Sequence, residues 1–241
     1  MTAQVLRLPT EASTRDRLVD AAERLFAERG IEAVSLREIT RESGARNAIA
    51  AQYHFEDRAG LVRAIMARHL PEVNARRHAL LDAYEASSSS DPRELAAAYV
   101  RPFAPKLETG SGRAFLVVHA DVLNRPDPRV SASTLDDPAD STYRWRALIG
   151  AHLDRTSLDL HRRFTAVLHA AVELARRAKD ERHVDNRLFI SSLIDVATAI
   201  LVTPPSAETT RLLAQRPTPK PRRARGVDPR HPSHHPDQPN I

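Results

Sequence analysis

The stretch SGARNAIAAQYHFEDRAGL at residues 43–61 groups side chains of the types that bind nucleic acid. An arginine donates two hydrogen bonds to the edge of guanine, and asparagine or glutamine pairs in the same way with adenine. Arg46, Asn47 and Gln52 are therefore candidates for base recognition.

Three rings stand together near the end of this stretch. Phe55 is expected to point into the core of a small helical unit. Tyr53 and His54 are expected near the surface, where their polar ends reach phosphate oxygens. Phe55 would then fix the segment to the core as an anchor, and Tyr53 and His54 would be two candidate contacts to a nucleic-acid backbone.

Catalytic and metal-binding patterns are missing from the sequence. The seven histidines between residues 69 and 183 form no H-E-x-x-H pattern, and there is no nucleophile elbow or phosphate-binding loop. His161 and His169 would share a helix face but stand about two turns apart, too far for joint ligation. With no cysteine, thiolate catalysis and cysteine-ligated zinc are also excluded. We expect no enzyme activity, no metal and no cofactor.

Length, hydropathy and charge limit the classes of protein to which the chain can belong. A chain of 241 residues allows a small head on a larger body, and this arrangement is expected. The most apolar run, 188–202, is too short to span a membrane and contains Asp195, which predicts a buried helix. The first residues lack the apolar core of a signal peptide, so the cytoplasm is the expected location. The net charge of +5 lies mostly in the tail, where six basic residues face two acidic ones from Arg216 onward.

Few glycines and a repeated apolar spacing of three and four residues predict an all-α protein. Capping residues mark the first helices. They are Ser13 with Asp16 and a closing Gly30 for the first helix, and Ser35 with Glu38 and a closing Ser43-Gly44 for the second. A third short helix is predicted from about Asn47 to Tyr53.

A long helix bent at Pro71 is predicted to follow Arg58. Further helices are predicted at about 93–108, 112–124, 140–154, 157–180, 185–202 and, shorter, 206–214. Nine of the 17 prolines lie in the last 38 residues, a composition that forms no packed core. The expected domains are a flexible arm at 1–12, a helix-turn-helix domain at 13–60, a helical domain at 61–203 and a Pro- and Arg-rich tail at 204–241, which is expected to be disordered.

The head resembles a known family. TRDRLVDAAERLFAERGIEAVSLREITRESGA, followed by QYHFEDRAGLVRAI, is similar to the N-terminal DNA-binding domain of TetR-type transcriptional repressors. That pattern has a first helix ending in LFAxxG, a V-S-x-R-x-I helix, a glycine, and a recognition helix ending in Tyr-x-Phe before a basic residue. The match spans about residues 13–65, and the body shares only the family's all-helical size and layout.

The resemblance extends the set of candidate DNA contacts. Arg37 matches a family contact position, and Arg58 matches the basic residue that grips a phosphate. Ala48 joins them because small side chains at 48, 50 and 51 let a helix approach the groove closely, although alanines are equally good helix formers. The spacing from Gly44 to His54 is two residues longer than the commonest family spacing, so the start of the recognition helix is remodelled.

For the body, the resemblance implies dimerisation through the last two long helices and a cavity for a small organic effector. Candidate dimer residues are Leu168, Val172, Leu193, Ile194, Ala197 and Leu201. Helices this apolar are equally suited to the interior of the monomer. Candidate ligand residues are Phe103, Phe115, His119, Val122, Trp145 and His152, which would also make an ordinary core.

The expected function is that of a ligand-responsive repressor that binds double-stranded DNA at a palindromic operator as a homodimer. The alternative is a helical adaptor that has lost sequence-specific DNA binding.

Overall fold

The computed structural model describes residues 13–47, 49–87, 89–125, 140–180 and 185–216. Within these ranges every regular element is a helix and there is no strand, so the all-α prediction is confirmed. The predicted arm at 1–12 lies outside the described residues. The chain divides into two compact units, Met1–Pro204 and Pro205–Ile241.

The first helix, α1 (Thr14–Arg29), has the predicted ends. The Ser13 hydroxyl accepts the backbone N–H of Asp16, and Gly30 follows the last turn with a φ of 87°. That positive φ suits glycine because it has no Cβ to clash. The face of α1 toward the core carries Leu18, Ala22 and Phe26.

The second helix, α2 (Leu36–Glu42), opens with the predicted capping box between Ser35 and Glu38. Both halves are formed, because the Ser35 hydroxyl accepts the Glu38 N–H and the Glu38 carboxyl accepts the Ser35 N–H. Gly44, with a φ of 66°, lies in the turn after the helix. A left-handed residue is needed there to redirect the chain.

The third helix, α3 (Ala50–Phe55), begins later than the predicted Asn47. The Asn47 side chain accepts the backbone N–H of Ile49, an Asx turn that keeps these residues out of the helix. The Thr40 hydroxyl then accepts the N–H of Ala51 and holds the start of α3 against α2.

A single long helix, α4 (Arg58–Ser87), leads out of the head and runs along the body. The predicted boundary between residues 60 and 61 falls inside it. Pro71 lies within α4, and the helix continues beyond it. Gly60 allows the first turn to pass close to the Phe55 carbonyl, which a Cβ would overlap.

The rest of the body follows the predicted order of helices. They are α5 (Pro92–Val100), the 3-10 helix η1 (Arg101–Glu108), α6 (Gly110–Leu123), α7 (Ser141–Gly150), α8 (Arg155–Asp159), α9 (Arg162–Lys179) and α10 (Arg187–Val202). Two predicted helices are divided. Residues 101–108 form η1 because Pro102 and Pro105 lack the N–H groups of an α-helix. His161, with a φ of 56°, separates α8 from α9.

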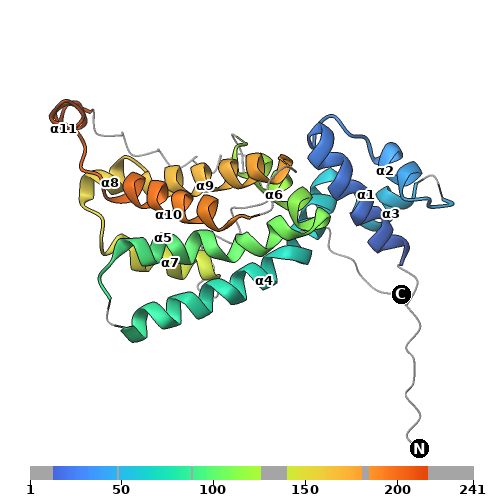
Figure 1. Ribbon diagram of the computed structural model, residues 1–241. Coiled ribbons are helices and arrows are strands. Elements are labelled where there is room, and N and C mark those ends of the chain that lie inside the picture. Colours follow the sequence, from blue (N-terminus) through green and yellow to red (C-terminus); the bar gives the residue numbers. More distant parts are fainter. Residues whose placement is uncertain (1–12, 48, 88, 126–139, 181–184, 217–241) are drawn as a thin grey trace, which may run out of the picture. The chain divides into compact units, whose positions relative to one another are not determined.

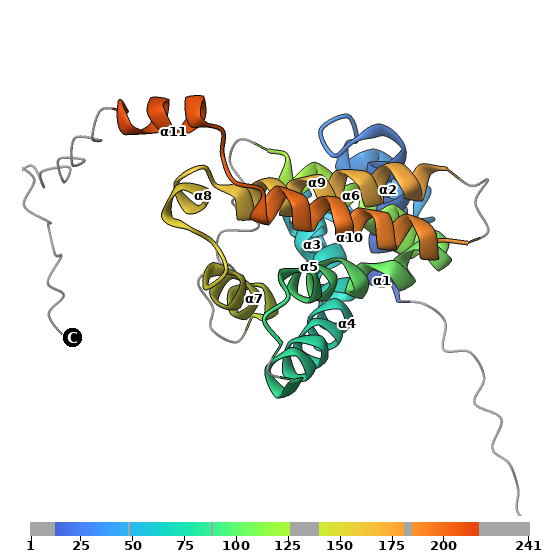
Figure 2. The same ribbon diagram turned by 60° about the vertical axis from the view of Figure 1, so that its left-hand side comes forward.

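Helix α6 is the centre of the first unit, with α1, α4, α9 and η1 packed around it (Figure 1). Its side chains Phe115, Leu116 and Val118 are fully buried. Helices α9 and α10 run side by side along the body, as both views show (Figure 2). Because α6 contacts both α1 and α9, it joins the head to the rest of the body.

The second unit contains α11 (Ala207–Ala214), the short helix predicted near 206–214. Ser206 caps it through the N–H of Thr209, and none of its residues is buried. No single helix in the described segments is long and apolar enough to cross a membrane, although α10 and α11 pass such a test of length and composition when taken together.

Candidate functional site

The outer face of α3 carries the polar residues that the sequence singles out. Ala50, Ala51 and Phe55 are buried, so α3 has one face in the core. Tyr53 on the opposite face is 80% exposed, with its ring at 5.3 Å from that of His54. The predicted division of the rings into one anchor and two surface groups is confirmed.

The turn before α3 presents Arg46 and Asn47 to solvent, and Gln52 is exposed on the first turn of α3. Ala48 lies outside the described residues. Ala50 and Ala51 pack inward, so they serve the core of the head. Ile49, which the sequence analysis did not select, is an exposed apolar residue beside these polar groups.

The arginines of the head divide into two groups by their partners. Arg24, Arg29 and Arg58 form ion pairs with glutamates. The others are exposed and form no ion pair with any carboxylate in the described segments; they are Arg15, Arg17, Arg37, Arg41 and Arg46. The head, residues 13–60, has nine acidic residues against eight arginines, so any attraction for an anion depends on where these unpaired arginines lie.

Arg17 was not predicted as a contact. It borders an open hollow formed with the turn at Gly44–Asn47 and with Tyr53 and His54. The hollow brings the start of α1 next to α3. No signal in the local sequence indicates this proximity, because it depends on how α1 crosses α3.

Arg58 has an internal partner. Its guanidinium donates to the carbonyl and the carboxyl oxygen of Glu32, at 2.9 and 2.8 Å. Glu32 also pairs with Arg125 at the end of α6, at 3.0 Å. Arg58 therefore connects the head to the body in this structure. Both Arg58 and Glu32 are substantially exposed, so the pair is weak.

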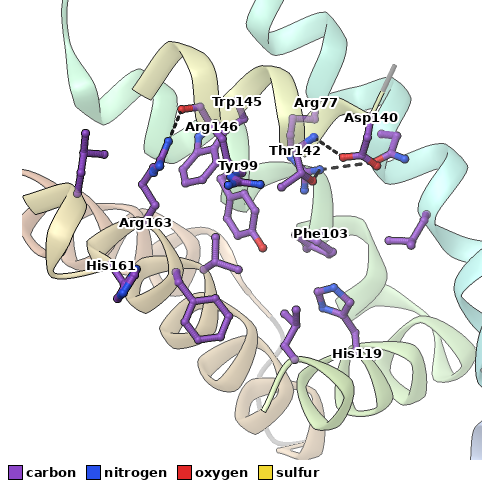
Figure 3. Close-up of a pocket in the computed structure, with 16 residues that line it drawn as sticks. Arg77, Tyr99, Phe103, His119, Asp140, Thr142, Trp145, Arg146, His161 and Arg163 are labelled. Atoms are coloured by element: carbon purple, nitrogen blue, oxygen red, sulfur yellow. Dashed lines mark hydrogen bonds between the residues drawn. The ribbon is translucent and has the colours of Figure 1, made fainter. Parts of the chain in front are cut away.

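The body contains a cavity of about 250 Å³ (Figure 3). Its wall comes from α4, α5, η1, α6, α7, α8 and α9. The apolar part of the wall is Leu70, Tyr99, Phe103, Leu123, Trp145, Leu158, Phe164 and Val167. The polar part is Asn74, Arg77, His119, Asp140, Thr142, Arg146, His161 and Arg163.

Three of the six predicted ligand residues line this cavity: Phe103, His119 and Trp145. The other three lie elsewhere. Phe115 is buried against His69, with ring centroids 4.5 Å apart. Val122 is buried in the core, and His152 bonds to the Tyr84 hydroxyl at 2.8 Å. The prediction that these three line the cavity is therefore wrong, because their helix positions turn them toward other neighbours.

Arg77 is the most unusual group in the wall and was missed in the sequence. It is 2% exposed, and its Nη1 donates to the hydroxyls of Ser141 and Thr142 at 2.8 and 3.1 Å. Its Nε has no hydrogen-bond partner. Burial lowers the pKa of Arg77. The sequence did contain an indication of this burial, because Arg77 lies on the apolar face of α4 between Val73 and Leu81.

Burial also keeps the two nearest titratable rings neutral at pH 7. It raises the pKa of Tyr99 to about 12. Burial, with a smaller effect from the charge of Arg77, lowers the pKa of His119 to about 4. The guanidinium of Arg77 stacks over the rings of Tyr99 and Phe103, at 4.8 and 5.4 Å from their centroids.

The candidate dimer residues on α10 need correction. Leu193, Ile194, Ala197 and Leu201 are buried inside the protomer, so a second copy cannot reach them. For this face of α10, the alternative interpretation, that the helix lies in the interior of the monomer, is the correct one. Leu168 and Val172 on α9 are partly exposed and stay candidates.

The exposed side of α10 carries apolar residues among Ser191, Ser192 and Asp195. Leu188 is 81% exposed and Val196 is 42% exposed, and both were overlooked because the buried face of α10 is equally apolar. Together with Leu168 and Val172 they define the open α9–α10 face.

A buried polar cluster joins the head to the body. Glu23 on α1 is 2% exposed and accepts the Ser111 hydroxyl of α6 at 2.5 Å. The Nε2 of His69 on α4 lies 3.2 Å from the other Glu23 oxygen. His69 stacks on Phe115, which lies next to His119 in the cavity wall. A row of rings therefore runs from the cavity to α1.

No group of three or more metal-binding side chains occurs among the residues that the structure describes. The comparison with protein families matches residues 18–65 to the model described as bacterial regulatory proteins, tetR family. No curated protein in the comparison matches the chain.

One similar solved structure is PfmR from Thermus thermophilus, a TetR family transcriptional regulator. It is 21% identical over 79% of this chain and 85% of its own, with a TM-score of 0.37.

Proposed function

We propose that the chain is a ligand-responsive repressor of the TetR family, because residues 18–65 match the model described as bacterial regulatory proteins, tetR family. It binds a palindromic operator as a homodimer. The observation that carries the proposal is the two-faced α3, which buries Phe55 and presents Tyr53 to solvent.

The proposed reading of DNA uses α3 and the turn before it. A recognition helix in the major groove reads base edges with side chains at its N-terminal end, where Arg46, Asn47 and Gln52 lie. Asn47 also holds the turn through its bond to Ile49, so its role in base recognition competes with a structural one. Tyr53 and His54 contact phosphates in this arrangement, as does Arg37 on α2.

Arg58 is proposed to exchange partners. In this structure only its Nη1 bonds to Glu32, whereas a DNA phosphate can accept two parallel hydrogen bonds from the guanidinium. Since the exposed pair with Glu32 is weak, the exchange costs little.

The open α9–α10 face supports dimer formation. Exposed apolar side chains on two neighbouring helices gain free energy when a second copy covers them, at about 25 cal/mol per Å² of apolar surface. A two-fold axis on this face gives an isologous contact and two copies of α3. A spacing of roughly 34 to 36 Å between the two recognition helices would match successive major grooves.

The cavity and the row of rings support the response to a ligand. The rings of Phe103 and His119 are 5.2 Å apart, and His119 is 5.5 Å from Phe115. A ligand that displaces His119 pushes on α6 and, through His69, on α1. The ligand releases DNA only to the extent that it binds more tightly to the form with misplaced recognition helices.

Selection of bound sequences from random DNA duplexes tests the proposal. We expect a two-fold symmetric sequence for the wild-type protein. Tyr53→Ala should weaken binding to the selected duplex about 5- to 150-fold, equivalent to about 1 to 3 kcal/mol. Tyr143→Ala, at an exposed tyrosine of α7, is the matched control and should leave the affinity unchanged.

Two results would count against the proposal. If no sequence is enriched, the head has lost sequence-specific binding and the chain is a helical adaptor. If Tyr53→Ala and Tyr143→Ala bind equally well, α3 does not contact DNA as proposed.

A further inference from the structure

The starting observation is a buried guanidinium with no ion-paired carboxylate among the described residues. Burial lowers its pKa, and Asp140 acts on it only at longer range, in the raising direction. Arg77 lies inside the body and donates only to neutral oxygens, those of Ser141, Thr142 and Asn74. No carboxylate in the described segments forms an ion pair with it. Its Nε–H is unbonded although it is buried. A buried charge in that state is costly unless another group compensates it.

The other deeply buried cation of the body is paired. Lys106 on η1 is similarly buried, and its Nζ lies 2.5 Å from a Glu72 carboxyl oxygen. The fold therefore supplies a carboxylate where a buried cation has a structural role. Arg77 lies on the same α4 as Glu72 but faces the cavity instead.

The wall around Arg77 contains further arginines. Arg146 and Arg163 line the same cavity, and burial together with the charge of Arg146 lowers the pKa of Arg163. Asp140 is the one acidic residue in the described part of the wall, and its carboxyl is engaged at the start of α7 by the N–H of Thr142 at 2.7 Å. An incoming anion would relieve the repulsion between these arginines.

The rest of the wall suits a compact apolar group. Trp145 and Phe103 face the cavity (Figure 3), and the indole N–H of Trp145 already donates to the Leu95 carbonyl. The volume of about 250 Å³ lies just below the usual range of roughly 300 to 1,000 Å³ for ligand sites. The space fits a small organic molecule with one polar end.

We propose that this cavity binds a small organic anion, a carboxylate with an apolar or aromatic body, and that Arg77 receives the carboxylate. The inference rests on the proposed ligand response and assigns its chemical class. Arg77 lines the cavity and supplies the positive charge for the carboxylate, and the neutral phenol of Tyr99 and the imidazole of His119 are within the same cavity as further polar partners. The body of the ligand then packs against Phe103 and Trp145.

The fluorescence of Trp145 provides a direct assay, because it is the single tryptophan of the chain and lines the cavity. We would titrate the protein, without DNA, with phenylacetate, phenylpropanoate and octanoate, each paired with its primary amide. The amides have the same shape without the charge. Each acid that binds should do so about ten- to hundredfold more tightly than its amide, as expected for a hydrogen bond to a charged group.

Variants assign the preference to its residue. Arg77→Gln should abolish the difference between acid and amide, and Arg163→Gln should reduce it. Arg76→Gln is the matched control. Arg76 directly precedes Arg77 on α4, but its side chain is exposed and pairs with Glu72. Arg76→Gln should bind as the wild type does. If Arg77→Gln does not fold, the wild-type comparison of acids with amides still decides.

Equal affinities for acids and amides, or no binding of any acid, would overturn the proposal. An unchanged preference in a folded Arg77→Gln protein would do the same. Release of the selected DNA duplex by the same acids tests the proposed function separately. An acid that binds at Trp145 without changing DNA affinity contradicts the ligand response and leaves the anion site in place.

Discussion

The buried cluster of Glu23, His69 and Ser111 allows a quantitative test of how the head is held to the body. Glu23→Ala removes the acceptor of the Ser111 hydroxyl and the partner of His69 Nε2. His69 is then left without this bond in a buried site, whereas Ser111 is exposed and can bond to water. Breaking a buried polar network of this kind costs about 3 to 5 kcal/mol.

We take the lower end, about 3 kcal/mol, because Arg68, at 3.5 Å from Glu23, is partly exposed and already pairs with Asp20 at 2.5 Å. For a protein of this size each kcal/mol lowers the melting temperature by about 2 to 4 °C, so Glu23→Ala should melt about 6 to 12 °C below the wild type. Ser111→Ala removes one hydrogen bond and should cost about 1 kcal/mol.

Thermal unfolding followed by circular dichroism is the assay. Glu28→Ala is the control, since Glu28 is on the same helix, is exposed, and pairs only with Arg24 at 3.6 Å in the described part of the chain. It should change stability by less than about 0.5 kcal/mol. If Glu23→Ala and Glu28→Ala melt at the same temperature, the cluster does not hold α1 to α4 and α6, and the proposed route from cavity to head fails.

Three further predictions concern the head and the dimer. Gly60→Ala places a Cβ on a backbone carbonyl and should destabilise the protein by about 3 kcal/mol in urea unfolding, whereas Gly110→Ala, with open space at its Cβ, should cost much less. Hydrogen bonds from Arg29 and then from Ser35 lower the pKa of Glu38 to about 2 from an ordinary 4.5. The stability that this provides is present above pH 4.5 and is lost as the pH falls toward 2, so Glu38→Gln should differ from the wild type at pH 7 and converge with it in acid. Val196→Glu on the open α9–α10 face should give a monomer in sedimentation, and Leu212→Glu on α11 should not.

Each of these has a clear contrary result. Equal unfolding free energies for the two alanine variants would mean that the first turn of α4 yields to a Cβ. A difference between Glu38→Gln and the wild type that persists down to pH 2 would contradict the lowered pKa. Dimers of unchanged stability in Val196→Glu would place the contact between copies elsewhere.

Local chemistry made much of the head predictable. The caps at Ser13 and Ser35 and the turn at Gly44 follow from bonds between residues close in sequence, and the structure has each of them. The start of α3 was misplaced because the Asn47 side chain competes with the helix for the Ile49 N–H.

The body was less predictable because its contacts join distant residues. A helix such as α10 carries apolar residues on both sides, and the sequence does not indicate which side α5 and α9 cover. Arg77, between two other basic residues of α4, looks like part of a solvated face, and it is buried because α5, η1 and α7 close over it. Its place on the stripe of Val73 and Leu81 was the one available indication.

The most direct test of DNA reading by a symmetric pair of α3 helices is hydroxyl-radical footprinting on a duplex selected by the protein. Such a pair predicts two equivalent protected regions related by the two-fold axis of the sequence, with centres roughly 34 to 36 Å or a multiple of that apart along the duplex, and loss of both in Tyr53→Ala. A single protected region, or protection that is the same on unrelated duplexes, would contradict it.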